Sequence, residues 1–149
     1  MKRRSTGGFT LLELLLVLAI LALGVALVLP SLSGPLASAR FRQGGAEFRA
    51  AMVQARSRAA ASGRTRVVRI DLGTGEYGIP SDNVDRVLPE GVRVSSVTAA
   101  GETVERGVAE LRFFPDGSAE AAEVVLADGG GGRILLTVDP LTGLVEAGA

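Results

Sequence analysis

The sequence predicts an α+β protein in which a long amino-terminal helix is followed by a domain of antiparallel β-sheet. Three observations support this prediction. An apolar stretch runs from Phe9 to Leu29, apolar residues recur at helical spacing through residues 37–62, and strand-like alternation begins after Gly63. The chain of 149 residues is long enough for one such domain.

The amino-terminal apolar stretch has the length and the flanking charges of a membrane-spanning helix. At about 1.5 Å per residue, residues 9–29 match the ~30 Å hydrocarbon core of a bilayer. Lys2, Arg3 and Arg4 precede this stretch, and by the positive-inside rule they hold the amino terminus in the cytoplasm. We therefore expect everything after Pro30 to lie on the far side of the membrane.

A single carboxylate, that of Glu13, interrupts the apolar stretch near its cytoplasmic edge. A charged side chain at the centre of a bilayer costs about 2.5–3.5 kcal/mol on insertion scales, so an acid retained there is a functional candidate. We expect packing against another subunit to neutralise Glu13, which makes it an assembly residue. The alternative is that Glu13 only reaches to the headgroups.

The segment 31–62 is predicted to continue as a helix. Pro30 and Pro35 should kink or locally unwind its start, and Ser62-Gly63 is a helix-stop signal. Spacings of four and three residues define one apolar seam, which we expect to pack on the sheet: Phe41, Gly45, Phe48, Met52, Ala55 and Ala59. The arginines that flank this seam are interpreted as a solvated helix face rather than a nucleic-acid or lipid-headgroup patch: Arg40, Arg42, Arg49, Arg56 and Arg58.

Alternation with a period of two after Gly63 predicts short antiparallel strands joined by tight turns. The expected strands are 67–72, 76–79, 92–97, 109–114, 123–127, 133–138 and 144–146. The intervening residues 80–89 and 98–107 are expected to be loops. Because Pro115-Asp116-Gly117-Ser118 is a strong turn signal, we expect strands 109–114 and 123–127 to pair as a hairpin.

The composition excludes several kinds of catalytic and metal site. Without cysteine or histidine, the chain has no disulfide, no Ser–His–Asp or Cys–His catalytic group and no His/Cys metal site. Carboxylate catalysis by Asp82 with Asp85 remains possible, but no signal places these groups together in a cleft. Oxygen ligands for calcium are also present, although without a known calcium-loop pattern, at Asp82, Asn83, Asp85, Asp116 and Asp128. We expect no cofactor, no metal and no enzymatic activity.

Three interpretations of the amino terminus are open. A cleavable secretory signal peptide would use Ala37-Ser38-Ala39 as its cleavage site, but the apolar stretch is longer than usual and contains Glu13. A plain membrane anchor explains the length and the orientation of the stretch but not the presence of Glu13. The third interpretation rests on a resemblance.

The segment Gly8-Phe9-Thr10-Leu11-Leu12-Glu13 resembles the processing site of the type IV pilin and type II secretion pseudopilin superfamily. The resemblance implies that a prepilin peptidase cuts after Gly8, which removes the leader 1–8, and methylates Phe9. It also implies that Glu13 guides docking into a fibre and that Pro30 bends the helix. The implied fold is type IV pilin-like, with one long spine helix and a β domain. Residues 9–30 form the transmembrane and assembly half of the spine helix, and residues 31–62 form its amphipathic half. Residues 63–149 form a periplasmic antiparallel β domain.

The carboxyl-terminal residues resemble a narrower group, the H-type minor pseudopilins of type II secretion. A phenylalanine, a Pro-Asp-Gly-Ser-like turn and a late Thr-Gly hairpin recur in that group, and they match Phe113 to Ser118 and Thr142-Gly143. The resemblance implies a structural subunit that is inserted in the bacterial inner membrane and later joins the periplasmic pseudopilus. Its implied partners are other minor and major pseudopilins, the prepilin peptidase and the inner-membrane assembly platform.

A FimT-like minor type IV pilin, which serves pilus assembly, adhesion or DNA uptake, is the alternative function. Both kinds of protein share their fold and processing. A role in DNA uptake predicts an exposed basic cluster, but the final hairpin carries Arg133 against Asp128, Asp139 and Glu146. Removal of residues 1–8 would also leave an excess of carboxylates, which disfavours nucleic acid as a partner.

Overall fold

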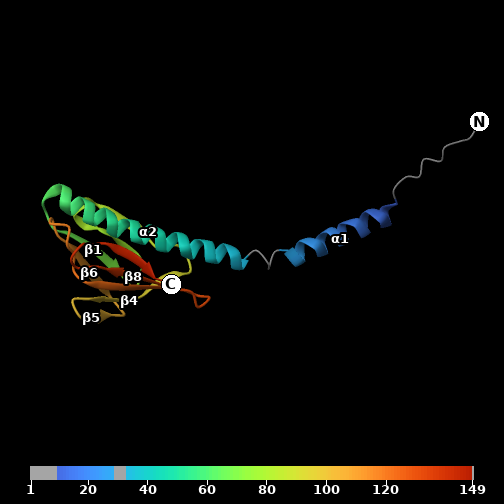
Figure 1. Ribbon diagram of the computed structural model, residues 1–149. Coiled ribbons are helices and arrows are strands. Elements are labelled where there is room, and N and C mark those ends of the chain that lie inside the picture. Colours follow the sequence, from blue (N-terminus) through green and yellow to red (C-terminus); the bar gives the residue numbers. More distant parts are fainter. Residues whose placement is uncertain (1–9, 29–32, 149) are drawn as a thin grey trace, which may run out of the picture. The chain divides into compact units, whose positions relative to one another are not determined.

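The computed structural model describes residues 10–28 and 33–148 of the chain (Figure 1). The chain divides into two compact units, Met1–Leu36 and Ala37–Ala149. Helix α1 (Leu11–Val28) and the start of helix α2 (Ser33–Ser62) belong to the first unit, and the rest of α2 and the strands belong to the second.

Helix α1 is apolar around its whole circumference apart from Glu13. Leucine, a strong helix former, dominates its sequence, so the backbone favours the helix without help from tertiary contacts. Its large side chains from Leu11 to Leu23 are exposed, for example 78% for Leu11 and 68% for Leu23. An apolar helix of this kind must be surrounded by lipid or by other protein surfaces, because water would otherwise contact its apolar side chains.

The predicted membrane span lies partly outside the part of the chain that the structure describes. Its two ends, Phe9 and Leu29, are outside, and so are the leader 1–8 and Pro30 with its predicted kink. Within residues 10–28 and 33–148, no helix meets both the length and the apolarity required to cross a membrane.

Helix α2 buries the apolar seam that the sequence predicts. All members of the seam are buried: Phe41, Gly45, Phe48, Met52, Ala55 and Ala59. The helix ends at Ser62, and Gly63 follows it with φ +63°, a left-handed conformation that glycine adopts without steric cost. Both features confirm the predicted seam and helix end. The expected unwinding at Pro35 is not observed, because α2 begins at Ser33 and Pro35 lies in its first turn, where a proline is tolerated.

Two glycines in the middle of α2 allow the helix to approach the β domain closely. A Cβ atom on Gly45 would lie 2.7 Å from Ile134 Cδ1, and one on Gly44 would lie 3.0 Å from Pro89 Cδ. Glycine inside a helix costs roughly 1 kcal/mol relative to alanine. This packing explains why two residues that weaken the helix occur in its central turns.

The β domain contains two antiparallel sheets (Figure 1). The first has the order β3-β2-β1-β6, with β1 (Arg66–Asp71), β2 (Glu76–Ile79), β3 (Val84–Val87) and β6 (Val108–Phe113). A 3₁₀ turn, η2 (Pro80–Asp82), connects β2 to β3. The second has the order β5-β4-β7-β8-β9, with β4 (Val92–Ala99), β5 (Glu102–Val104), β7 (Ala122–Asp128), β8 (Arg133–Val138) and β9 (Val145–Gly148).

The pairing of β6 and β7 differs from the sequence prediction. They do not form the expected hairpin, because β6 pairs with β1 while β7 pairs with β4 and β8. The turn 115–118 leads instead into a bridge between Phe113 and Ala119. Beyond that bridge the chain enters the second sheet, where β7 buries Val124 and Leu126 completely. The turn signal was correct, but burial rather than the turn decides the partner strand.

Two segments expected to be loops contain short strands, β3 within residues 80–89 and β5 within residues 98–107. Both are edge strands. An edge strand has a partner on one side only and little buried surface, so it lacks the apolar alternation that marks a buried strand. Val87, which is 62% exposed, illustrates this.

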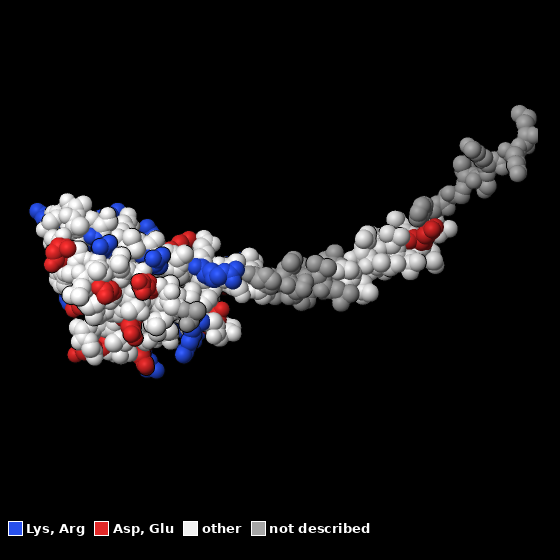
Figure 2. Space-filling view, in the orientation of Figure 1, with Lys and Arg blue, Asp and Glu red and all other residues white. Residues whose placement is uncertain are grey.

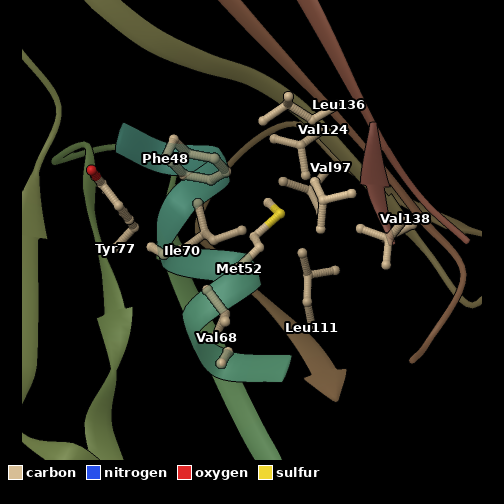
Figure 3. Close-up of a cluster of buried hydrophobic side chains, with 14 of the residues drawn as sticks. Phe48, Met52, Val68, Ile70, Tyr77, Val97, Leu111, Val124, Leu136 and Val138 are labelled. Atoms are coloured by element: carbon tan, nitrogen blue, oxygen red, sulfur yellow. The ribbon is translucent and has the colours of Figure 1, made fainter. Parts of the chain in front are cut away.

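The core lies where α2 packs against both sheets (Figure 3). Phe48 and Met52 project from α2 among side chains from the two sheets, and both are fully buried. The rings of Phe48 and Tyr77 lie 4.6 Å apart between centroids, at an interplanar angle of 48°. Because residues from α2, β1 and β7 share one core, the helix and both sheets stabilise each other.

Candidate functional site

The predicted assembly residue, Glu13, lies in the first turn of α1. Thr10 precedes the helix and acts as its N-cap: the Glu13 backbone N–H donates to Thr10 Oγ1 over 3.3 Å and to the Thr10 carbonyl over 3.0 Å. Gly8 and Phe9, the predicted cleavage and methylation residues, lie outside the described residues. The described part of the site is therefore a capped helix start with a carboxylate three residues beyond the cap.

The position of Glu13 gives its carboxylate two possible functions. Thr10 and Glu13 have the spacing of a capping box, in which a glutamate at this position stabilises the start of the helix. The partial positive charge at a helix amino terminus also favours an acid here. The Glu13 side chain is exposed, among exposed leucines. The sequence analysis identified the charge and missed the cap, although the Thr-x-x-Glu pattern was readable.

Three arginines of α2 contact the β domain. Arg49 Nε donates to the Val145 carbonyl over 2.8 Å, and Arg56 Nε donates to the Gly117 carbonyl over 3.3 Å. Arg58 donates to Asp82 Oδ2 over 2.7 Å. The interpretation of these arginines as a solvated face is wrong, because they hold the helix to loops and strands far away in the sequence. Arg40 and Arg42 are exposed.

Asp82, a candidate for calcium binding and carboxylate catalysis, forms ion pairs with two arginines. Its carboxylate lies 2.7 Å from Arg58 and 3.6 Å from Arg66, and its side chain is 13% exposed. The hydrogen bond from Arg58, supported by the charge of Arg66, holds the pKa of Asp82 below its ordinary value, although desolvation opposes this shift. Asp85 lies on β3 opposite Gly78. The ion pairs give Asp82 a structural role in joining α2 to η2.

Two other candidate calcium ligands, Asp116 and Asp128, form hydrogen bonds within their own turns. Asp116 Oδ1 accepts from the Ser118 hydroxyl over 2.6 Å and from its backbone N–H over 3.0 Å, and these bonds lower the pKa of Asp116. Asp128 Oδ1 accepts from the backbone of Gly130 and Gly132. Within residues 10–28 and 33–148, no cluster of three or more acidic side chains has the arrangement of a metal site.

The two carboxyl-terminal motifs, the 115–118 turn and Thr142-Gly143, contact each other in the structure. Gly143, at φ +61°, lies so close to Gly117 that a Cβ atom on it would overlap the Gly117 carbonyl oxygen. The same Cβ would be 3.0 Å from Arg56 Cδ. The Ala119 backbone N–H donates to the Pro140 carbonyl over 3.0 Å. We call Arg56, Gly117 and Gly143 the turn-contact cluster, and sequence analysis did not identify Arg56 as part of it.

The second turn is held in a fixed conformation by its own aspartate. Asp139 Oδ1 accepts from the Thr142 backbone N–H and hydroxyl, each over 2.8 Å, and from the Leu141 backbone N–H over 3.0 Å. These bonds, that from the Thr142 backbone most of all, lower the pKa of Asp139. The turn therefore presents Gly143 to Gly117 in one geometry.

An apolar amino-terminal helix and an antiparallel β domain packed on α2 define a type IV pilin-like fold. Residues 45–142, about two thirds of the chain, match the family described as type II transport protein GspH. Residues 3–29 match the prokaryotic N-terminal methylation motif. The chain belongs to the GspH family, and the resemblance to H-type minor pseudopilins is thereby confirmed.

A curated relative agrees with this family. Type II secretion system protein H of Xanthomonas campestris pathovar campestris is 29% identical over 146 residues, which cover 98% of this chain and 80% of that protein. No solved structure matches the chain. The predicted function of a minor pseudopilin of type II secretion is confirmed at the level of the family.

Proposed function

We propose that this chain is inserted in the bacterial inner membrane and is then built into the periplasmic pseudopilus of a type II secretion system. The match of residues 45–142 to the GspH family is the observation that carries this proposal. The β domain supplies the subunit's folded body, and the apolar side chains of α1 supply the surface that packs first with lipid and later with other helices. The proposed partners are the major and the other minor pseudopilins and the inner-membrane assembly platform.

The proposed processing follows the methylation motif at residues 3–29. A prepilin peptidase cuts after Gly8 and methylates Phe9, which becomes the new amino terminus. Lys2, Arg3 and Arg4 keep this end in the cytoplasm until cleavage, and the β domain lies in the periplasm.

Glu13 is the proposed docking residue. An exposed carboxylate surrounded by exposed leucines has no partner among the described residues of its own unit. The free amino group of Phe9 on a neighbouring subunit offers the opposite charge. Leaving one member of a buried ion pair without its partner typically costs 3–5 kcal/mol, so correct stacking is favoured over other arrangements.

The folded domain is proposed to be structural rather than catalytic. Several described carboxylates stabilise turns or join elements, as Asp82 does between η2 and α2 and Asp139 does in the turn before β9. This is the architecture of a rigid subunit body.

The mature amino terminus tests the proposed processing. We expect mass spectrometry of the protein purified from its host to find a chain that begins at methylated Phe9. Gly8→Leu should leave the leader attached, whereas the matched substitution Gly7→Ala should be processed normally. A chain that begins at Arg40 would instead identify a signal peptide cleaved after Ala39, and an intact leader in wild-type protein would rule out the proposed processing.

Secretion tests the function itself. In a host that lacks its own copy of this subunit, the wild-type chain should restore export of type II substrates into the medium, and Gly8→Leu should not. Export that is normal without the chain would contradict the proposed role.

A further inference from the structure

A groove of about 400 Å³ lies where the start of the buried part of α2 packs beside β8 and β9. Its floor is made of small or apolar residues from these three elements: Gly45, Ala46, Ile134, Leu136, Ala147 and Gly148. The groove exists in part because Gly45 has no side chain, since a Cβ atom there would reach Ile134. Strand β9, which contributes Ala147 and Gly148, is the edge strand of its sheet.

Three arginines are among the residues that line this groove, Arg42, Arg49 and Arg133. Its described lining includes neither Asp nor Glu. Arg49 is fixed in place by the bond from its Nε to the Val145 carbonyl, which leaves its terminal nitrogens available. Arg42 and Arg133 are exposed and form no ion pair with another described residue.

Two carboxylates close to the groove in the sequence form hydrogen bonds with uncharged groups. Glu47 accepts a hydrogen bond from Gln43 over 2.9 Å, and Asp128 accepts the backbone N–H groups of its own turn. Figure 2 shows arginine side chains exposed along the beginning of α2. The groove therefore combines an apolar floor with three arginines, none of which forms an ion pair with another described residue.

Charge on the second sheet is also separated along its strands. Arg93 and Arg133 lie in one cross-strand row, each opposite Ala127, at the end of the sheet near the groove. At the other end Glu123 and Glu146 lie in another row, each opposite Thr137. Arg133, at the positive end, lines the groove together with Arg42 of α2.

We propose that this groove binds the headgroup of an anionic phospholipid, with its phosphate between Arg42 and Arg133 and its glycerol and first acyl carbons on the apolar floor. Arginine binds phosphate through its planar fork of donors, and an apolar floor suits an amphiphile better than a free anion. The proposal rests on the proposed function, in which α2 begins where the chain leaves the bilayer. Arg42 follows Ser33, the first residue of α2, by roughly 14 Å along the helix axis.

Native mass spectrometry of the full chain in detergent micelles tests this site. The probes are a short-chain phosphatidylglycerol, a phosphatidylcholine with the same chains, and inorganic phosphate. We expect the wild-type chain to retain phosphatidylglycerol in preference to phosphatidylcholine. Arg42→Gln and Arg133→Gln should each weaken this binding about fivefold, the usual contribution of one basic residue near an anionic lipid surface.

Arg106→Gln is the matched control, because it removes the same charge from an exposed position outside the groove and should leave the affinity unchanged. Lys2, Arg3 and Arg4 are present in every variant, so their attraction for anionic lipid does not affect the comparison. Circular dichroism should show equal melting temperatures for all four proteins.

Several results would overturn the proposal. Equal binding by wild type, Arg42→Gln and Arg133→Gln would place the lipid elsewhere, and an equal loss in Arg106→Gln would show non-specific attraction. Displacement of phosphatidylglycerol by the same concentration of inorganic phosphate would show that the groove binds an anion and that its apolar floor does not contribute to the affinity. None of these results would alter the processed amino terminus or the export assay, so the proposed function is tested separately.

Discussion

At the scale of single residues, Glu13 combines two physical effects that a simple deletion would not separate. Its carboxylate is a charge in an apolar helix, and its position is also that of the glutamate in a capping box that begins with Thr10. Loss of a cap destabilises a helix start by about 1 kcal/mol. Loss of one partner of a buried ion pair costs about 3–5 kcal/mol. The second effect is larger and should dominate assembly.

A series of three variants separates these effects. Glu13→Gln keeps a side chain that can cap the helix but removes the charge, Glu13→Ala removes both, and Thr10→Ala removes the cap and keeps the charge. We expect both Glu13 variants to insert in the membrane and to be absent from cross-linked pseudopili, whereas Thr10→Ala assembles. If Glu13→Gln assembled like the wild type while Glu13→Ala did not, the carboxylate would serve the helix rather than the contact between subunits.

Asp82 provides a prediction about pH. Because Arg58 and Arg66 lower its pKa in the folded protein, protonation costs the folded state more than the unfolded state. Its contribution to stability is therefore present above the unfolded value of about 4 and is lost as the pH falls through the folded pKa. The melting temperature of Asp82→Asn should lie below that of the wild type at neutral pH, and the difference should shrink in acid. Asp85→Asn, at a neighbouring exposed carboxylate, is the control, and a difference that stays constant with pH would contradict the ion pairs.

At the scale of elements, the turn-contact cluster joins α2 to two turns that are far apart in the sequence. Arg56 and Gly117 are 61 residues apart, and the Gly143 backbone packs against both. Only a residue without a side chain fits at Gly143, because any Cβ atom would overlap the Gly117 carbonyl oxygen. The cluster gives the late Thr-Gly hairpin a structural reason beyond ordinary turn chemistry.

Substitution of Gly143 by alanine tests this cluster. Gly63 has nearly the same φ, +63° against +61°, but a Cβ atom on it would meet nothing within 4 Å. Gly63→Ala should therefore cost only the backbone strain, about 1 kcal/mol, and Gly143→Ala should cost a further 1–3 kcal/mol, roughly the cost of overpacking. Denaturant unfolding of the full chain in mild detergent measures both, and equal losses would show that the close approach of the turns has little energetic weight.

At the scale of the whole molecule, the second compact unit contains the whole core that the described residues form. Its buried residues come from α2 and from both sheets, and the core begins at Phe41. No buried hydrophobic residue is found in the described part of α1. The domain should therefore be stable without the apolar helix.

A fragment of residues 37–149 tests this independence. We expect it to be soluble and monomeric by size-exclusion chromatography and to unfold cooperatively, because removal of α1 exposes none of the core. The full chain in detergent is the control and should show the same melting transition. A fragment that aggregates or lacks a cooperative transition would show that the β domain needs the amino-terminal unit.

The sequence by itself determined the features that depend on neighbouring residues or on linear motifs. The buried seam of α2, the helix end at Ser62, the turn at 115–118 and the position of Glu13 were all predictable, because helix periodicity and turn chemistry act over a few residues. The H-type resemblance was predictable for the same reason, since its motifs are contiguous.

Only the tertiary structure decided which distant segments meet. The partners of β6 and β7, the strands β3 and β5 and the contacts of Arg49, Arg56 and Arg58 were not predictable. Arg49 and Val145, for instance, are 96 residues apart. No local preference distinguishes such a contact from a solvated arginine, because it forms only when the burial of the entire core fixes where α2 lies on the two sheets.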